Sequence, residues 1–145
     1  MRWIEFMPLD ADQLWRKEDI LTGAEIKAII EATYGPLVVI TTADPSETAR
    51  RYTFNDGIGE VGFINPVSEP FCSTCDRIRL TADGQLRTCL FSTEEMDLRA
   101  VLRSGASDEE LIQIIRQAVW NKELKHYIGD KRFKRANRSM SMIGG

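Results

Sequence analysis

Histidine and cysteine, the side chains that most often bind transition metals, are scarce in this chain. Its 145 residues include one histidine and three cysteines, and an odd number of cysteines excludes a fully paired disulfide framework. No apolar run approaches the roughly 18 residues of a membrane span. Basic residues are not in excess, because the net charge is −3, so the electrostatic footprint of a nucleic-acid-binding protein is missing. We therefore expect a cytoplasmic protein that binds neither membranes nor nucleic acid.

The chain has enough apolar residues to bury one core. They make up 43% of the sequence, and charged residues make up 28%. Residues 2–8 (RWIEFMP) predict a short strand that ends at a proline. Thr22 and Glu25 have the spacing of a capping box, so we expect a helix that begins there and ends at Gly35. A second strand is expected over residues 37–42.

Two hairpins and several helices are expected in the rest of the chain. Residues 50–64 read as strand, glycine-rich turn and strand, and residues 77–90 read as a second hairpin around Ala82, Asp83 and Gly84. Two further capping boxes, at residues 92–95 and 107–110, predict two helices. Apolar residues follow one face of the second of these helices. The pattern predicts an α/β protein, which as an isolated chain would be classed as α+β.

All three cysteines lie within a short stretch of the chain. Cys72 and Cys75 are separated by two residues, and Cys89 follows after thirteen more. Zinc sites normally have four protein ligands, and the single histidine, His126, lies far away at the end of a predicted helix, where a surface or partly packed side chain is the simpler interpretation. Three thiolates without a fourth suit a cubane iron–sulfur cluster with one unligated iron, which can accept a substrate nitrogen or oxygen.

Other interpretations of the cysteines stay open at this point. Cys72 and Cys75 could form a redox pair, and all three cysteines could be small buried apolar residues. A structural zinc domain is a third alternative, and a non-enzymatic module that binds a metal or a nucleotide is a fourth.

The register of the second hairpin decides which residues share a face. A two-residue turn at 83–84 would pair Leu80 with Arg87, whereas a three-residue turn at 82–84, with Gly84 in the left-handed conformation, pairs Leu80 with Leu86. The second register gathers the apolar residues on one face, so we expect burial to select it. That face would carry Ile78, Leu80 and Leu86.

The opposite face of this hairpin would be strongly basic. In the expected register it carries Arg77, Arg79, Arg87 and Cys89 together. Such a face repels itself unless it meets an anion or acidic neighbours. Guanidinium groups suit phosphate oxygens and the acceptor edge of guanine, so a nucleotide phosphate is the interpretation we favour. The alternative is a solvated strand face with carboxylate neighbours.

The segments around the cysteines resemble a known enzyme family. Residues 71–84 (FCSTCDRIRLTADG) and 86–91 (LRTCLF) are similar to the C-terminal region of the GTP 3',8-cyclase family, radical adenosylmethionine enzymes that open molybdenum cofactor biosynthesis. The cysteine spacing together with Arg77 and Arg79 is the specific part of this resemblance. Weaker matches extend it over nearly the whole chain, at residues 4–8, 62–66, 97–103 and 144–145.

The resemblance implies roles for particular residues. Cys72, Cys75 and Cys89 would hold the C-terminal 4Fe–4S cluster of the family, whose open iron faces the guanine. The segment Arg77, Ile78 and Arg79 would bind GTP.

Further roles are implied at the two ends of the chain. Met7 matches a methionine at an S-adenosyl-L-methionine-binding strand end, and Arg2 matches a basic residue near the triphosphate. Gly144 and Gly145 match a flexible tail that reaches into the active site, where a backbone without side chains can approach a ligand closely.

The resemblance also implies a layout and a missing part. The fold would be the C-terminal part of an incomplete α/β barrel. Residues 1–49 would supply the last barrel strand and a helix, 50–91 the hairpins with the cluster ligands, and 92–145 helices and the Gly-Gly tail. The family's N-terminal CxxxCxxC motif is absent from these residues. We therefore expect a missing N-terminal radical-cluster domain and an inactive isolated chain.

The implied reaction converts GTP to 3',8-cyclo-7,8-dihydroguanosine 5'-triphosphate, a lyase activity of the full-length enzyme. An exposed barrel edge at residues 2–8 makes a homodimer or a domain swap a further expectation.

Overall fold

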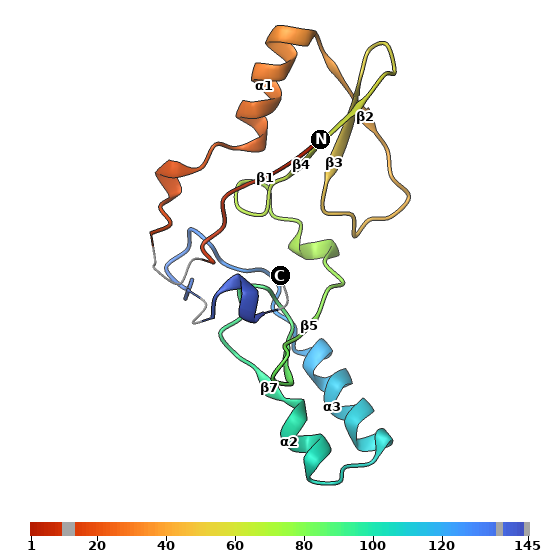
Figure 1. Ribbon diagram of the computed structural model, residues 1–145, viewed down its shortest axis with the longest axis vertical. Coiled ribbons are helices and arrows are strands. Elements are labelled where there is room, and N and C mark those ends of the chain that lie inside the picture. The colour runs from red at the N-terminus through yellow and green to blue at the C-terminus, as the bar shows by residue number, and fades with distance from the viewer. Residues whose placement is uncertain (10–13, 136–137, 144–145) are drawn as a thin grey trace. The chain divides into compact units, whose positions relative to one another are not determined.

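The computed structural model describes residues 1–9, 14–135 and 138–143 (Figure 1). They form two compact units. The first unit comprises Met1–Met7 and Trp15–Cys75, and the second comprises Pro8–Leu14 and Asp76–Gly145. Helices and sheets occur in both units, which confirms the predicted α+β class. In the part of the chain that is described, none of the helices has the length and apolar character needed to cross a bilayer.

The first unit is a four-stranded sheet with one α-helix. Its strand order is β1-β4-β3-β2, with β1 parallel to β4 and the other neighbours antiparallel. The hairpin predicted for residues 50–64 is confirmed as β3 and β4. The elements are β1 (Arg2–Ile4), α1 (Gly23–Tyr34), β2 (Leu37–Ile40), β3 (Arg50–Phe54) and β4 (Glu60–Ile64).

Helix α1 begins and ends where the sequence predicts. The Thr22 hydroxyl accepts a hydrogen bond from the Glu25 backbone N–H at 3.3 Å, and the Glu25 carboxylate accepts one from the Thr22 N–H at 2.8 Å. Gly35 follows the helix with a φ of 87°. The helix packs on the sheet through a core of Leu37, Val61 and Phe63, against which Trp3, Ile26, Ile30, Tyr52 and Phe54 lie.

Strand β1 is shorter than predicted: it ends at Ile4, although the Glu5 N–H still donates a hydrogen bond to the Ile64 carbonyl oxygen of β4 at 3.1 Å. Glu5, which follows it, is only 4% exposed. Its carboxylate accepts hydrogen bonds from the backbone N–H groups of Val67 at 3.0 Å and Ser68 at 2.9 Å, and from that of Gly23 at 3.4 Å. A buried carboxylate needs such donors, so Glu5 fixes the loop after β4 and the start of α1 to the strand end.

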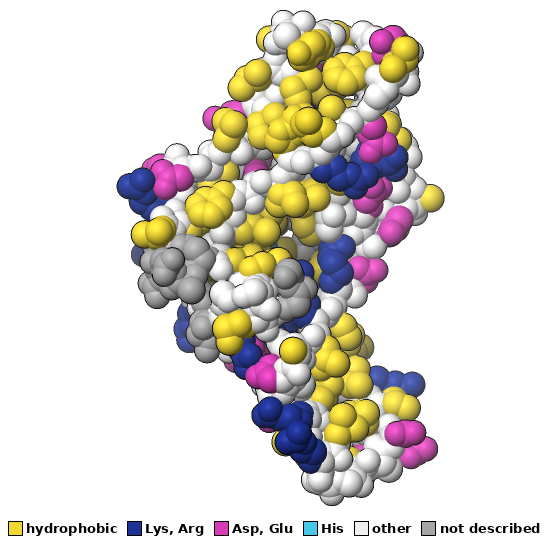
Figure 2. Space-filling model, viewed as in Figure 1, with side chains coloured by type: hydrophobic (Ala, Val, Ile, Leu, Met, Phe, Trp, Pro, Cys, Tyr) yellow, Lys and Arg dark blue, Asp and Glu magenta, His cyan; other side chains and the backbone are white. Residues whose placement is uncertain are grey.

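The sheet of the first unit leaves apolar side chains on its surface. Strands β1 and β2 are its two edges among the described residues, and Ile4 on β1 is 59% exposed. Large exposed apolar side chains also lie on α1 and β2, including Ile29, Tyr34 and Val39. Figure 2 shows hydrophobic side chains gathered over this part of the first unit. The exposed edge predicted at the start of the chain is therefore present at β1.

The second unit combines a small sheet with two helices. The sheet is antiparallel, in the order β5-β6-β7. Leu86, Leu98 and Ala118 form its core, with Leu111, Ile114 and Ile115 of the second helix packed against them. The elements are β5 (Arg79–Leu80), β6 (Gln85–Arg87), β7 (Met96–Asp97), α2 (Leu98–Arg103) and α3 (Asp108–Trp120).

The hairpin β5–β6 has the predicted three-residue turn. Leu80 pairs with Leu86 and Arg79 with Arg87, and Gly84 has a φ of 82°. Apolar burial accounts for this register only in part, because Leu86 is buried but Leu80 is 61% exposed and Ile78 is 43% exposed. Arg87, on the face expected to meet a ligand, is fully buried instead. In this register a charged side chain, Arg87, is therefore buried as well as an apolar one, Leu86.

Of the two capping boxes predicted in the second unit, one begins a helix and the other does not. Ser107 and Glu110 cap α3 as predicted. The prediction of a helix start at Ser92–Glu95 was wrong: α2 is capped by Asp97, whose carboxylate accepts a hydrogen bond from the Ala100 N–H at 2.9 Å. Glu95 is used elsewhere, as described below. After α3 the described chain is mainly irregular, with one short 3-10 helix, η3 (Met140–Met142), where helices were expected.

We predict that Gly84→Ala lowers the free energy of unfolding of the second unit more than Gly105→Ala does. Both glycines have positive φ angles, and alanine there costs about 1–2 kcal/mol. A Cβ at Gly84 would also lie 2.6 Å from the Cβ of Arg99, whereas nothing lies within 4 Å at Gly105. Urea unfolding of the two variants measures the difference, and equal losses would contradict the close contact at Gly84.

Candidate metal and anion site

Cys72 and Cys75 lie on one tight turn. The 3-10 helix η2 spans Cys72–Thr74, and the Cys75 N–H donates a hydrogen bond to the Cys72 carbonyl oxygen at 3.2 Å. Neither cysteine is in a disulfide bond, and both residues are partly exposed. A two-residue spacer on such a turn can direct two sulfur atoms to one metal centre.

Cys89 follows β6 in the second unit, is partly exposed and is not in a disulfide bond. The backbone N–H of Phe91 donates a hydrogen bond to its sulfur at 3.5 Å. Hydrogen bonds of this kind stabilise a thiolate and tune iron–sulfur centres. Cys89 also borders a cavity of about 340 Å³, whose lining includes Phe91 and His126. The environment of Cys89 therefore suits a metal-bound thiolate.

The described residues do not form a complete metal site. Among them, no three His, Cys, Asp or Glu side chains are grouped so that they could hold a metal ion. Cys72 and Cys75 belong to the first unit and Cys89 to the second. The donor chemistry of three cysteines outside disulfide bonds, one with an N–H group on its sulfur, still fits an iron–sulfur cluster, and the three-cysteine ligand set stays a prediction.

His126 is packed against an aromatic ring. It lies beyond the end of α3, so the prediction that it ends a helix was wrong. Its ring contacts Phe91 edge to face, with centroids 5.2 Å apart, and its Nδ1 accepts a hydrogen bond from the Ile128 N–H at 3.0 Å. A partly packed histidine, the simpler of the two interpretations, is the one that these contacts support.

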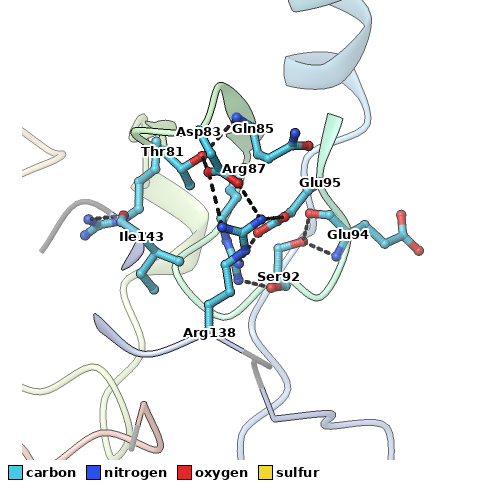
Figure 3. Close-up of polar contacts among 10 residues, drawn as sticks. Thr81, Asp83, Gln85, Arg87, Ser92, Glu94, Glu95, Arg138 and Ile143 are labelled. Atoms are coloured by element: carbon cyan, nitrogen blue, oxygen red, sulfur yellow. Dashed lines mark hydrogen bonds and ion pairs between the residues drawn. The ribbon is translucent and has the colours of Figure 1, made fainter. Parts of the chain in front are cut away.

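The buried Arg87 has acidic and carbonyl partners (Figure 3). Its Nη1 lies 2.6 Å from Glu95 Oε1, and its Nη2 donates to the Ser92 carbonyl oxygen. The register of β6 and β7 explains the first contact, because Leu86 pairs with Met96 and the next residues are thus Arg87 and Glu95. Arg87 is therefore a structural side chain. For this arginine, the carboxylate neighbour that was the alternative to a bound phosphate is present.

Arg138 extends this network to the turn of the hairpin. Its Nη2 lies 2.9 Å from Glu95 Oε2 and 3.0 Å from Asp83 Oδ2, and its Nη1 donates to Asp83 Oδ1 at 3.2 Å. The Thr81 hydroxyl also donates to Asp83, at 2.5 Å. The hydroxyl and the guanidinium together lower the pKa of Asp83 to about 2, so this carboxylate is ionised at neutral pH.

The predicted GTP segment lies at the start of this hairpin. Arg77 and Arg79 are partly exposed and Ile78 is exposed. An Arg77 Nη1 lies 3.9 Å from the Asp76 carboxylate, and Arg79 Nη1 donates to the Ile143 carbonyl oxygen at 3.4 Å. Of the predicted arginine face, Arg87 is thus enclosed by the protein, while Arg77 and Arg79 have surfaces that a ligand can reach.

Lys122 joins the two strands beyond the point where their ladder ends. Its ammonium group donates to the Arg77 carbonyl oxygen at 2.9 Å and also to the Thr88 carbonyl oxygen. The neighbouring Glu123 accepts a hydrogen bond from the Thr88 hydroxyl at 2.6 Å. The residues just after α3 therefore hold the open end of the hairpin, next to both Arg77 and Cys89. Nothing in the sequence pattern pointed to this contact.

The remaining predicted site residues lie at the two ends of the chain. Arg2 Nη2 lies 3.3 Å from Glu60 Oε1. Because neighbouring strand residues point to opposite faces of a sheet, Arg2 lies on the face opposite to Trp3 and α1. Met7 is partly exposed. Gly144 and Gly145 lie outside the described residues.

Residues 1–128 match the protein family described as Molybdenum Cofactor Synthesis C. The chain belongs to this family. The match includes the three cysteines and the arginine segment, so it covers both parts of the candidate site. Arg138 and the C-terminal segment lie beyond the matched residues.

Members with curated names are similar to the entire chain. A GTP 3',8-cyclase of Rhodococcus opacus is 46% identical over 145 residues, and the chain covers 41% of it. Another from Streptomyces coelicolor is 46% identical with 42% covered, and one from Rhodopirellula baltica is 43% identical over 147 residues with 41% covered. The chain thus spans about two fifths of the length of these relatives.

We predict that Arg87→Met destabilises the second unit strongly. Without the Arg87 guanidinium, Glu95 Oε1 and the Ser92 carbonyl oxygen lose their donor, and each buried group left unsatisfied costs about 1–3 kcal/mol, although Glu95 keeps its pair with Arg138. Arg99→Met is the matched control: its pair with Asp97 is longer, at 3.6 Å, and half exposed, so the expected loss is about 0–1 kcal/mol. Denaturant unfolding compares the two, and a mild effect of Arg87→Met would contradict its structural role.

Proposed function

We propose that this chain is the GTP-facing, C-terminal portion of a GTP 3',8-cyclase. The observation that carries the proposal is the 46% identity that extends over all 145 residues to relatives with that name. The reaction would convert GTP to 3',8-cyclo-7,8-dihydroguanosine 5'-triphosphate in molybdenum cofactor biosynthesis. The chain's three cysteines are all committed to one centre in this proposal. The cluster that cleaves S-adenosyl-L-methionine would then belong to the part of the enzyme outside this chain, and the chain alone would be inactive.

Cys72, Cys75 and Cys89 are the proposed ligands of a 4Fe–4S cluster. When bound, the cluster would supply an iron with an open coordination position for a nitrogen or oxygen of guanine. Three observations support this assignment: none of the cysteines is in a disulfide bond, a tight turn carries the first two, and an N–H group donates to the sulfur of the third. A centre of this kind also suits the reducing cytoplasm, where we place the protein.

Arg77 and Arg79 are the proposed partners of the GTP phosphates, with Ile78 between them in contact with the nucleotide. Guanidinium groups form paired hydrogen bonds with phosphate oxygens and keep their charge at all physiological pH values. Their accessible surfaces and the enclosure of neighbouring Arg87 support a division of roles, with Arg87 structural and the other two ligand-binding. Held in this way, the ribose and the base would be positioned for the radical step.

Arg2 and Met7 are proposed to act from the end of β1. In an α/β barrel, helices cover the outside, so the strand face that points away from them lines the interior. Arg2 lies on the sheet face opposite to α1, which suits a group near the triphosphate. Met7 would contact S-adenosyl-L-methionine, and Gly144 and Gly145 would form the active-site tail. The missing N-terminal portion, or a second copy of the chain, would cover the exposed edge of β1.

We predict that anaerobic reconstitution loads one 4Fe–4S cluster on each chain. Replacement of Cys72, Cys75 or Cys89 by serine should remove most of the bound iron and sulfide, because each variant lacks one thiolate. Ser73→Ala, an exposed position between two of the ligands, is the matched control and should load normally. Iron, sulfide and zinc analysis with electron paramagnetic resonance measures the outcome.

Stoichiometric zinc without sulfide would overturn the cluster and favour a structural zinc domain. Full loading of a single cysteine variant would show that the replaced cysteine is not a ligand.

We predict that Arg77→Ala with Arg79→Ala weakens GTP binding to the reconstituted chain at least about tenfold, because each lost charge-assisted hydrogen bond is worth about 1.5–3 kcal/mol. The matched control removes two exposed arginines from α2 of the same unit, Arg99→Ala with Arg103→Ala, and should bind GTP normally. Isothermal titration calorimetry compares the affinities. Equal binding by both double variants would refute the phosphate role.

A further inference from the structure

The C-terminal segment 138–143 has little secondary structure of its own. Within it, the Met142 N–H donates a hydrogen bond to the Ser139 carbonyl oxygen at 3.0 Å, and the Ile143 N–H donates one to the Met140 carbonyl oxygen at 3.2 Å. A single 3-10 turn of this kind is not stable by itself. Its side chains must therefore supply the contacts that hold it on the second unit.

Two side chains anchor the segment, one at each end. Ile143 is fully buried, so its apolar surface is removed from water at the end of the segment. Arg138, at the beginning, is only 19% exposed and contacts two carboxylates. In Figure 3 its guanidinium lies between Asp83, from the hairpin turn, and Glu95, which precedes β7.

The charges around Arg138 balance. Glu95 is shared between Arg87 and Arg138, and Asp83 meets the remaining side of Arg138. Two guanidinium groups and two carboxylates thus alternate along one chain of contacts. Arg138 uses two nitrogens on the two oxygens of Asp83, at 3.0 and 3.2 Å, a geometry that a lysine ammonium cannot reproduce.

The segment anchored in this way meets the proposed GTP site at Arg79. The Ile143 carbonyl oxygen accepts a hydrogen bond from Arg79 Nη1 at 3.4 Å. A carbonyl oxygen orients a guanidinium without cancelling its charge, whereas a carboxylate would compete with a phosphate for it. The contact therefore suits an arginine that must point in one direction and still attract an anion.

We propose that Arg138 is a positioning residue: by its contacts with Asp83 and Glu95 it latches residues 138–143 onto the hairpin and holds the Ile143 carbonyl on Arg79. The part of this inference that concerns GTP rests on the proposed function. The latch itself rests on the contacts of Arg138 and on the burial of Ile143.

The latch is tested by hydrogen exchange on the 145-residue chain. In Arg138→Gln the amides of Met142 and Ile143 should exchange at least about tenfold faster than in the unsubstituted chain, while those of α3 stay unchanged. Arg138→Lys keeps the charge but not the paired contact and should fall between the two. The matched control is Arg132→Gln, which removes a similar paired contact with Asp130 at 2.8 and 2.9 Å and should leave the C-terminal amides protected.

The consequence for the nucleotide is tested by GTP titration of the same reconstituted variants. Arg138→Gln should weaken binding severalfold although Arg79 is intact, and Arg138→Lys should restore part of the affinity. Unchanged exchange at Met142 and Ile143 in Arg138→Gln would overturn the latch, whatever the GTP affinity. Faster exchange with no GTP binding by the unsubstituted chain would instead overturn the proposed role of Arg79 and leave the latch standing.

Discussion

The side chain of Arg87 is fully buried, and the second unit depends on the way in which its charge is neutralised. Glu95 provides the carboxylate, and to reach Arg87 it must lie opposite β6, which places β7 in register and leaves Asp97 to cap α2. The second oxygen of Glu95 binds Arg138, so the same carboxylate also decides where the C-terminal segment lies. A buried ion pair contributes little net stability, but an unpaired buried charge is costly, and the cost excludes alternative arrangements of these strands.

Sequence patterns predicted those elements whose signals are local. The capping box of Thr22 and Glu25, the one of Ser107 and Glu110, and the positive φ of Gly84 depend on residues three or four positions apart, and each was found as expected. Ser92 and Glu95 have the same spacing, yet no helix begins there. Glu95 has a buried guanidinium to neutralise, and this long-range requirement outweighs a cap that is worth about 1 kcal/mol.

The candidate site was predictable in its residue types and less so in its surroundings. The spacing of the cysteines is given directly by the sequence, and the pairing of Arg79 with Arg87 could be predicted from it because the turn fixes the hairpin register. The different fates of Arg79 and Arg87 could not, since they depend on Glu95 and on Arg138, a residue more than fifty positions away. Glu5 and Lys122 were missed because they too bind groups distant in the sequence, and most of these partners are backbone groups, which leave no mark in a sequence.

Lys122 joins the two strands of the hairpin at the end opposite to the turn. At one end Gly84 turns the chain, and at the other a single ammonium group binds the carbonyl oxygens of Arg77 and Thr88. The segment from Arg77 to Cys89 therefore owes its shape to a residue that lies outside it. Transplanting residues 77–89 alone into another scaffold would carry over every candidate ligand of the hairpin. It would lose the Lys122 ammonium group, which holds the two strands together at their open end. A graft that keeps the geometry must bring Lys122, just after α3, with it.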